Sequence, residues 1–242
     1  MRPDGRQPDQ LRPYSLERGV AKFAEGSCLI KMGDTHVLCV ATVEDRVPGW
    51  LKAENKKNNT NRGWVTAEYS MLPRSGRDRN QREIMKPSGR SLEIQRLIGR
   101  CIRSVVELDR MGEYSLVVDC DVLQADGGTR TASVTGAYVA VYDAMNWMVS
   151  KRMIPHVMLR EPVAAISVGV FRNAEILDLN YDEDSNAATD MNVVMTGSGK
   201  FVEVQGTAEQ EPFSAETLGK MLKLGKKGID ELIQAQKDVL GL

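Results

Sequence analysis

A strand that passes through a glycine turn into a long apolar helix is the feature that most constrains the fold of this chain. Residues 114–123 have the composition of a strand, and Asp126, Gly127 and Gly128 form a turn signal after it. Residues 131–150 then have a helical composition and are apolar on nearly every side. Because a helix without a polar face has to be buried between other elements, the segment predicts a layered fold with this helix inside it.

The same turn has the chemistry of an anion site. Glycines let backbone N–H groups approach a ligand, and the first N–H groups of a helix carry partial positive charge. Arg130 adds a full charge and a planar set of donors at the start of the helix. Together these groups suit phosphate. The alternative is structural, because Asp-Gly is an ordinary turn and threonine is an ordinary helix cap.

The bulk composition narrows the classes of partner. The 242 residues are 42% hydrophobic and 27% charged, and the formal net charge is −1. This charge excludes nucleic-acid binding through overall basicity, so only local patches could hold RNA. No apolar run is long enough to span a membrane, so we expect no membrane partner.

The four cysteines indicate a reducing compartment. Cys28, Cys39, Cys101 and Cys120 stand among apolar residues, and no two of them form a C-x-x-C pair. Buried free thiols are therefore expected, and a zinc site is not. The first residues contain no apolar signal segment, which adds to the expectation of a cytoplasmic protein.

Two similar halves follow one another along the chain. The first contains a hairpin, a polar loop, a strand and an amphipathic helix, expected at 27–32 with 36–43, 47–61, 64–71 and 92–108. The second contains two hairpins and a final helix, expected at 164–171 with 175–181, 191–196 with 200–205, and 214–239. The strand 36–43, apolar on both faces, is expected at the centre of its sheet. The pattern predicts an α+β fold with pseudo-duplicated sheet-plus-helix halves, forming one domain over residues 1–242.

A basic segment at residues 74–90 lies in the first half, between the expected strand 64–71 and the expected helix 92–108. It has six basic and two acidic residues in seventeen positions, inside a nearly neutral chain. Arginines spaced along a loop suit phosphodiester contacts, because each guanidinium can donate to two oxygens. The alternatives are a solvated loop or an interface with acidic residues of a second copy. Arg90 follows a glycine just before a helix, where it could join Arg130 at one anion.

An acidic group in the second half has the composition of a cation site. Asp178, Asp182, Glu183, Asp184 and Asp190 fall within thirteen residues that contain no Lys or Arg. If the strand 175–181 continued, the even spacing of 178, 182 and 184 would place them on one face. Asp184 and Asp190 could converge and hold Mg²⁺, which keeps waters and meets a phosphate substrate. The alternative is an exposed acidic loop.

Several motifs resemble those of the ribonuclease PH family. They are CDVLQADGGTRTAS (120–133), EYSMLPR (68–74), EIQRLIGR (93–100), EDSNAATDMNVVM (183–195), MRPDGR (1–6) and VQGTAE (204–209). The resemblance covers nearly the whole chain. It implies a ribosomal-protein-S5-domain-2-like fold and a phosphorolytic 3′→5′ exoribonuclease that trims the 3′ ends of tRNA precursors. It also implies a homohexameric ring built as a trimer of dimers.

The resemblance assigns roles to particular residues. The phosphate ligands of the family fall on Arg90, Gly128, Thr129 and Arg130. The catalytic, metal-associated aspartates fall on Asp184 and Asp190, with Mg²⁺ or Mn²⁺ as cofactor and inorganic phosphate as co-substrate. The basic loop implicated in RNA binding and ring assembly falls on Arg74, Arg77, Arg79 and Arg82, to which Arg96 on the following helix is added as an RNA-binding residue.

Three departures from the family pattern concern loops. Residues 53–62 replace a shorter glycine-rich segment, the basic loop is slightly short, and Gln210 stands where glycine is expected. These bear on RNA affinity and substrate preference more than on the chemistry.

The residues also leave two rival functions open. A hydrolytic two-metal exonuclease would use the same aspartates, release nucleoside monophosphates and ignore added phosphate. A non-catalytic RNA-binding ring subunit would lack one of the arginine or aspartate positions, and all of them are present here.

Overall fold

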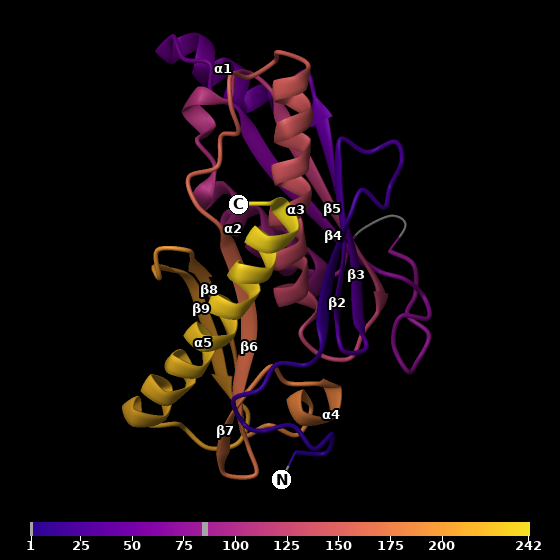
Figure 1. The fold of residues 1–242 in the computed structure, drawn as a ribbon, viewed down its shortest axis with the longest axis vertical. Helices are drawn as coiled ribbons and strands as arrows, with labels where there is room; N and C mark the ends of the chain where they lie inside the picture. Colours follow the sequence, from indigo (N-terminus) through magenta and orange to yellow (C-terminus); the bar gives the residue numbers. More distant parts are fainter. Residues whose placement is uncertain (1, 84–86) are drawn as a thin grey trace.

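Two antiparallel-rich sheets with helices between and beside them make up the structure (Figure 1). It is a computed structural model, and it describes residues 2–83 and 87–242. Met1, which begins the motif MRPDGR, and residues 84–86 of the basic segment therefore lie outside the described residues. The predicted α+β fold with two sheet-plus-helix halves is confirmed.

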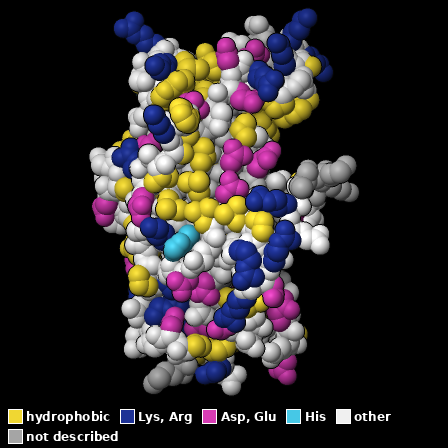
Figure 2. Space-filling view, turned by 90° about the vertical axis from the view of Figure 1, so that its right-hand side faces the viewer, with side chains coloured by type: hydrophobic (Ala, Val, Ile, Leu, Met, Phe, Trp, Pro, Cys, Tyr) yellow, Lys and Arg dark blue, Asp and Glu magenta, His cyan; other side chains and the backbone are white. Residues whose placement is uncertain are grey.

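The first sheet has the strand order β1-β2-β3-β5-β4, in which only β4 and β5 run parallel. Its strands are β1 (Tyr14–Arg18), β2 (Gly26–Met32), β3 (Thr35–Glu44), β4 (Trp64–Met71) and β5 (Ser115–Gln124). The strand expected at the centre is β3, and it occupies the middle of the sheet. One face of this sheet packs against helices. The opposite face is turned away from the helices and carries a band of hydrophobic side chains (Figure 2).

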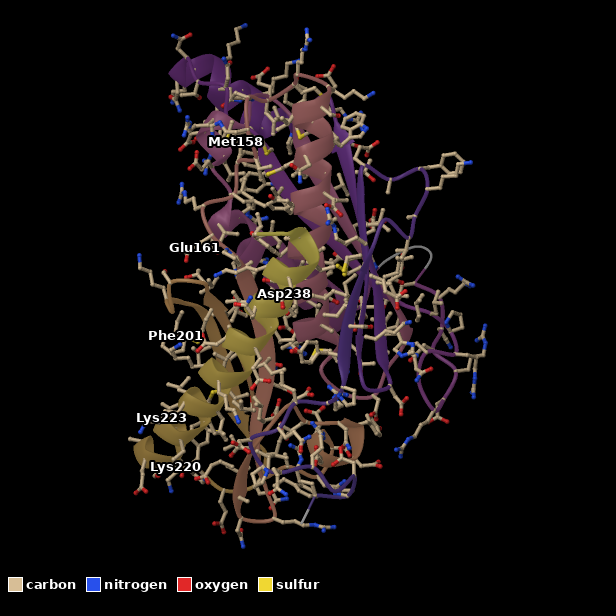
Figure 3. The ribbon with its side chains drawn as sticks, in the orientation of Figure 1. Met158, Glu161, Phe201, Lys220, Lys223 and Asp238 are labelled. Carbon is tan, nitrogen blue, oxygen red and sulfur yellow. The ribbon has the colours of Figure 1, made fainter. Side chains whose placement is uncertain are left out.

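The second sheet has the order β7-β6-β8-β9, and all its neighbours are antiparallel. Its strands are β6 (Val163–Phe171), β7 (Ala174–Leu177), β8 (Thr189–Thr196) and β9 (Phe201–Ala208). The final helix, α5 (Ala215–Leu240), packs on β6 and β7. Its apolar side is buried, whereas Lys220 and Lys223 project away from the sheet (Figure 3).

Helix α3 (Thr129–Ser150) lies between the two sheets and packs on β2, β3 and β6. Fifteen of its 22 residues are buried, as its uniformly apolar sequence predicts. The packing against β2 is close: a Cβ at Gly26 would lie 1.9 Å from the carbonyl oxygen of Ala140. A larger side chain at Gly26 would push α3 away from the sheet. The small residues at this contact therefore fix the position of the whole helix, including its first turn.

Two of the expected boundaries are wrong in the first half. The polar loop expected at 47–61 contains a helix, α1 (Gly49–Asn58). Its polar surface hides the helical period, and it is anchored by buried Leu51 and by Asn55, whose side chain donates to the carbonyl of Arg62 and accepts from Thr60. Helix α2 (Gly89–Val105) begins and ends three residues earlier than the range 92–108.

The acidic segment of the second half is also built differently from the expectation. Strand β7 ends at Leu177, and Asp178 adopts a left-handed backbone conformation with φ 55°. The short helix α4 (Tyr181–Asp184) follows, capped by Asn180 and Glu183. The idea that residues 178, 182 and 184 share one strand face is therefore wrong, because the buried carboxylate of Asp178 is bound by Arg12.

The buried side chains of both halves join in one large cluster. It contains Ile30 and Val118 from the first sheet, Ile166 and Val193 from the second, and Ile229 from α5. All four cysteines are buried and free, as expected. Among the described residues, no helix is long and apolar enough to cross a membrane.

Candidate active site

A cavity of about 320 Å³ opens where the ends of the two sheets meet. The first half contributes Arg77, Arg90, Gly127, Gly128, Thr129 and Arg130 to its walls. The second half contributes Ser167, Tyr181, Asp184, Asp190 and Asn192. The residues that the sequence assigned to phosphate and to a metal ion therefore line one space, although they are up to about 100 positions apart in the chain.

The N-terminus of α3 forms one wall of the cavity. Gly127 and Gly128 have positive φ values, 75° and 67°, which turn the chain from β5 into the helix. Gly128 is the N-cap and offers no side chain to the first N–H groups of the helix, so these remain available to a ligand. On the other side, the hydroxyls of Tyr69 and Thr129 share a hydrogen bond of 2.8 Å. The turn is thus held by the sheet and presents donors to the cavity.

Two guanidinium groups flank these N–H groups. Arg90 lies in the first turn of α2, and Arg130 in the first turn of α3. The Nη1 atom of Arg130 donates to Glu93 and to Gln205, each at 3.1 Å. Burial raises the pKa of Tyr69, and the positive charges of Arg90 and Arg130 oppose that rise, which places both charges near the same ring. Both arginines thus line the same cavity.

The carboxylates of Asp184 and Asp190 face the same cavity from α4 and β8. Burial raises the pKa of Asp184, the negative charge of Asp190 raises it further, and the charges of Arg130, Arg90 and Arg12 lower it. Two crowded carboxylates with open space beside them are a suitable donor set for a hard divalent cation. Among the described residues there is no group of three or more His, Cys, Asp or Glu side chains for a metal ion, so water and substrate would have to complete the coordination.

The sequence analysis missed three residues that the second half contributes to the cavity. Asn192 stands two positions after Asp190 on β8 and shares its face, so the strand period alone would have found it. Ser167 lies opposite Asn192 on β6, which only the strand register shows. Tyr181 begins α4, and its position depends on the end of β7 that the sequence did not predict.

Of the predicted RNA-binding residues, one reaches the cavity. The guanidinium of Arg77 lies 4.9 Å from the centre of the Tyr181 ring and donates to Asp182 at 2.7 Å. The other predicted RNA-binding residues do not line the cavity; they are Arg74, Arg79, Arg82 and Arg96. Arg79, Arg82 and Arg96 are exposed. These side chains are therefore basic groups outside the cavity and are not part of its wall.

Comparison with known proteins identifies the family. Residues 10–145 match the 3′ exoribonuclease family, domain 1, and residues 161–228 match domain 2 of the same family. The chain belongs to the ribonuclease PH family. A ribonuclease PH from Methylobacterium sp. (strain 4-46) is 56% identical over 243 residues, and the alignment covers the full length of both chains. The chain is thus a phosphorolytic 3′→5′ exoribonuclease acting on tRNA, with inorganic phosphate as its co-substrate.

Solved structures share the fold at low sequence identity. An Archaeoglobus fulgidus exosome with RNA bound to the active site contains a chain with a TM-score of 0.80 and 21% identity, covering 96% of this chain and 91% of that one. Rice Rrp46 has a TM-score of 0.77 and 19% identity, with complete coverage of both chains. The ribonuclease PH fold, and with it the S5-domain-2-like architecture, is therefore confirmed.

Proposed function

We propose that phosphorolysis takes place in this cavity, with inorganic phosphate held by Arg90, Arg130 and the N–H groups that follow Gly128. The supporting observation is that both guanidiniums, the uncapped start of α3 and the carboxylate pair line one space. Two anions must approach each other there, the phosphate and the last phosphodiester of the RNA. Neutralising their charges is the main catalytic task, and positive groups held in advance perform it without reorganisation.

The reaction breaks and forms one bond at the same phosphorus. A phosphate oxygen attacks the phosphorus of the last phosphodiester, and the bond to the 3′ oxygen of the preceding nucleotide breaks. The electron pair of that bond leaves with the 3′ oxygen, which takes up a proton, and the released product is a nucleoside 5′-diphosphate. Arg90 and Arg130 orient the attacking phosphate and stabilise the charge on the equatorial oxygens.

Asp184 and Asp190 are the residues we propose to hold Mg²⁺ or Mn²⁺. Both side chains line the cavity, and the negative charge of Asp190 raises the pKa of Asp184, so a cation bound between them would relieve their repulsion. When bound, the cation would supply charge neutralisation at the transferred phosphoryl group and the leaving oxygen. Proton donation to the leaving 3′ oxygen is the alternative role to metal binding, and Asp184 is the candidate for it because its pKa is raised.

The basic surroundings of the cavity are proposed to hold the RNA. Arg77 at the rim, with the exposed arginines Arg74, Arg79, Arg82 and Arg96, would contact phosphates upstream of the 3′ end. The RNA in question is the 3′ end of a tRNA precursor. Because the chain as a whole has a net charge of −1, this binding is local and weakens steeply with salt.

Assembly and location complete the proposal. We propose a homohexamer, arranged as a trimer of dimers, since the related folds belong to exosome cores. The cytoplasm is the proposed compartment, since all four cysteines are free thiols inside the fold.

The experiment that tests this function identifies the product with and without phosphate. Wild-type protein, RNA and phosphate are expected to yield nucleoside diphosphates, and omission of phosphate is expected to stop release. Arg130→Ala should reduce diphosphate release by about 10²-fold or more with the fold intact. Nucleoside monophosphates released without phosphate would favour the hydrolytic rival, and unchanged release by Arg130→Ala would refute the assigned phosphate site.

A further inference from the structure

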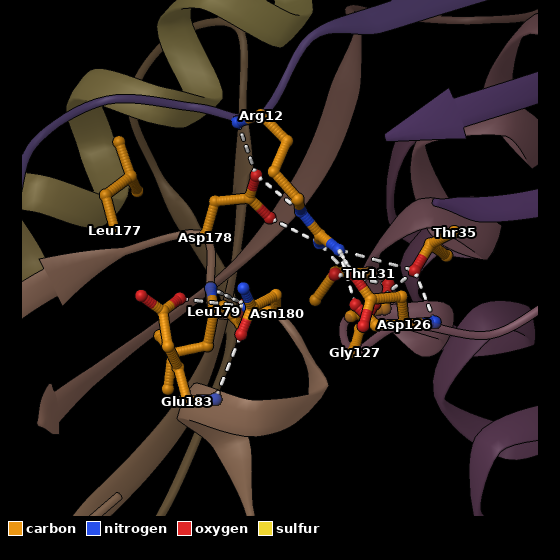
Figure 4. A network of polar contacts seen from close by, with 12 residues as sticks. Arg12, Thr35, Asp126, Gly127, Thr131, Leu177, Asp178, Leu179, Asn180 and Glu183 are labelled. Atoms are coloured by element: carbon orange, nitrogen blue, oxygen red, sulfur yellow. Dashed lines mark hydrogen bonds and ion pairs between the residues drawn. The ribbon is translucent and has the colours of Figure 1, made fainter. Parts of the chain in front are cut away.

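Arg12 is a buried charge behind the active site that the reaction itself does not use. Its side chain is 5% exposed, and it does not line the cavity. It comes from the N-terminal segment before β1, and its side chain extends between Asp178, just after β7, and the turn at Asp126 and Gly127 (Figure 4). A buried guanidinium is costly unless most of its donors are satisfied, so its partners indicate its role.

One edge of the Arg12 guanidinium holds the glycine turn. Its Nη atoms donate to the carbonyl oxygens of Asp126 and Gly127, and Thr35 supports the same turn by donating to the Gly127 carbonyl at 2.6 Å. In a trans peptide the carbonyl and the next N–H point in opposite directions. Holding the carbonyls of 126 and 127 on the Arg12 side therefore directs the N–H groups of Gly127 and Gly128 away from Arg12, on the side where both glycines line the cavity.

The other edge of the guanidinium holds the start of the acidic segment. Nε and Nη2 donate to the two carboxylate oxygens of Asp178 at 3.0 and 2.7 Å, and the Arg12 backbone N–H donates to the same carboxylate at 2.8 Å. Asp178 has a φ of 55°, in the left-handed region, which is uncommon outside glycine although aspartate adopts it more readily than most residues. The Arg12 contacts help to hold it, together with the Asp178 backbone N–H, which donates to the Ser167 carbonyl at 2.8 Å, and the guanidiniums of Arg2 and Arg6, which donate to the Asp178 carbonyl.

The geometry of Asp178 is passed on to α4. Two residues later, Asn180 caps this helix by accepting from Glu183 N–H at 2.9 Å, and Asp184 ends it. The turn and this segment also meet directly, because a Cβ at Gly127 would lie 2.6 Å from the carbonyl oxygen of Leu179. Any rotation of the Asp178 backbone therefore moves both the carboxylate of Asp184 and the neighbour of the glycine turn.

We infer that Arg12 is a positioning residue for phosphorolysis, because it fixes the phosphate-binding turn relative to the helix that carries Asp184. The inference rests on the proposed function, in which that turn binds the phosphate. Arginine is required for this role, since one planar group donates to a carboxylate along one edge and to two carbonyls along the other. Lysine keeps the charge but has a single nitrogen, so it cannot hold both partners in fixed directions.

The test is Arg12→Lys in the full-length protein, with Arg18→Gln as matched control. Arg18 belongs to the same N-terminal region but pairs with Asp143 on α3, outside the cavity. We expect Arg12→Lys to lower kcat/KM for phosphate by about 10²-fold, the size of effect that small misplacements produce. Its affinity for RNA, measured by fluorescence anisotropy without phosphate, should change less than about twofold, because the phosphate contacts of RNA lie elsewhere. Arg18→Gln should match the wild type in both.

Two results would overturn the inference. One is unchanged phosphate kinetics in Arg12→Lys, and the other is an equal loss of RNA affinity and phosphate kinetics, which a general loss of structure would cause. If Arg12→Lys does not fold, Asp178→Asn is measured in its place, since it removes the charge of the partner and keeps its shape. Asp178→Asn is expected to lower kcat/KM for phosphate while leaving RNA affinity nearly unchanged. If it does not, the positioning role of Arg12 is rejected.

The parallel measurement of Arg130→Ala separates this inference from the proposed function. Wild-type phosphate kinetics in both Arg130→Ala and Arg12→Lys would mean that the phosphate site itself is misplaced. A loss in Arg130→Ala alone would reject the role of Arg12 and leave the phosphate site in place.

Discussion

At the scale of single residues, the site concentrates charges that the folded chain would otherwise avoid. Partial burial of the Asp184 carboxyl raises its pKa, and the like charge of Asp190 raises it further. A carboxylate in that position disfavours the folded state, because its charged form is better solvated in the unfolded chain. The nearby guanidiniums of Arg90 and Arg130 offset part of this cost. The part that is not offset lowers the free energy of unfolding, as catalytic groups commonly do.

The first prediction follows from this conflict between stability and activity. Asp184→Asn should raise the Tm in buffer without divalent cations, because a neutral amide removes the repulsion with Asp190. The same variant should lose activity by about 10²-fold or more. Thermal unfolding in EDTA and diphosphate release under standard conditions measure the two effects. A lower Tm together with full activity would contradict the assigned role.

The same scale shows what a sequence can reveal of a site. Arg90, Arg130, Asp184 and Asp190 were singled out because an arginine at a helix start and a group of carboxylates without basic residues have the chemistry of ion sites, and all four line the cavity. Arg12 was not found, because a single arginine before a strand carries no sign of its partner 166 positions later. Buried ion pairs between distant segments depend on the final packing, and spacing in the sequence does not encode them.

At the scale of elements, local pattern predicted those helices and strands whose period is visible. Strand β5 and helix α3 lie within a few residues of the expected ranges, since alternation and an apolar run mark them. Helix α1 was missed because its exposed residues are polar on nearly every side. The end of β7 was misplaced because tertiary contacts of Asp178, and not local preference, stop the strand.

The second prediction concerns the open face of β5. Asp119 and Asp121 share this face with Glu68 on β4, which lies directly beside Asp119 in the strand register. Burial raises the pKa of both aspartates, and the neighbouring carboxylates raise it further. A carboxyl whose pKa is higher in the folded state binds more protons there. The destabilising effect is therefore fully present above the raised pKa and is relieved as the pH falls through it.

Substitution of Asp121 measures this effect. Asp121→Asn should raise the Tm at neutral pH, and the gain should shrink at acidic pH, because the wild-type carboxyl becomes neutral as the pH falls through its raised pKa. Glu54→Gln, which removes an exposed carboxylate on α1, is the control and should show no such dependence. An equal gain at both pH values would mean that charge is not its cause.

At the scale of the whole molecule, the site exists only because two halves are fixed against each other. Neither half contains both the arginines and the aspartates, and the cavity lies where the two meet. One cluster of buried residues includes both sheets, with α3 packed between them. We therefore propose that residues 1–242 form a single domain, although the family is described by two matched regions.

The third prediction tests that unity. Chemical unfolding followed by circular dichroism and by tryptophan fluorescence should give coincident single transitions, because a shared core couples the halves. The three tryptophans report on the first half of the fold and on α3, whereas circular dichroism reports on all of it. Two separated transitions would show that the halves unfold independently, and the single-domain proposal would fail.

The location of the nucleophile is the central claim, and a crystal structure with bound arsenate tests it most directly. Arsenate has the shape and charge of phosphate, and its anomalous scattering places the ion without ambiguity. The account predicts arsenate within hydrogen-bond distance of the guanidiniums of Arg90 and Arg130 and of the N–H groups at the start of α3, with Asp184 and Asp190 beside it. An ion bound elsewhere, with this cavity empty and the two guanidiniums directed apart, would contradict it.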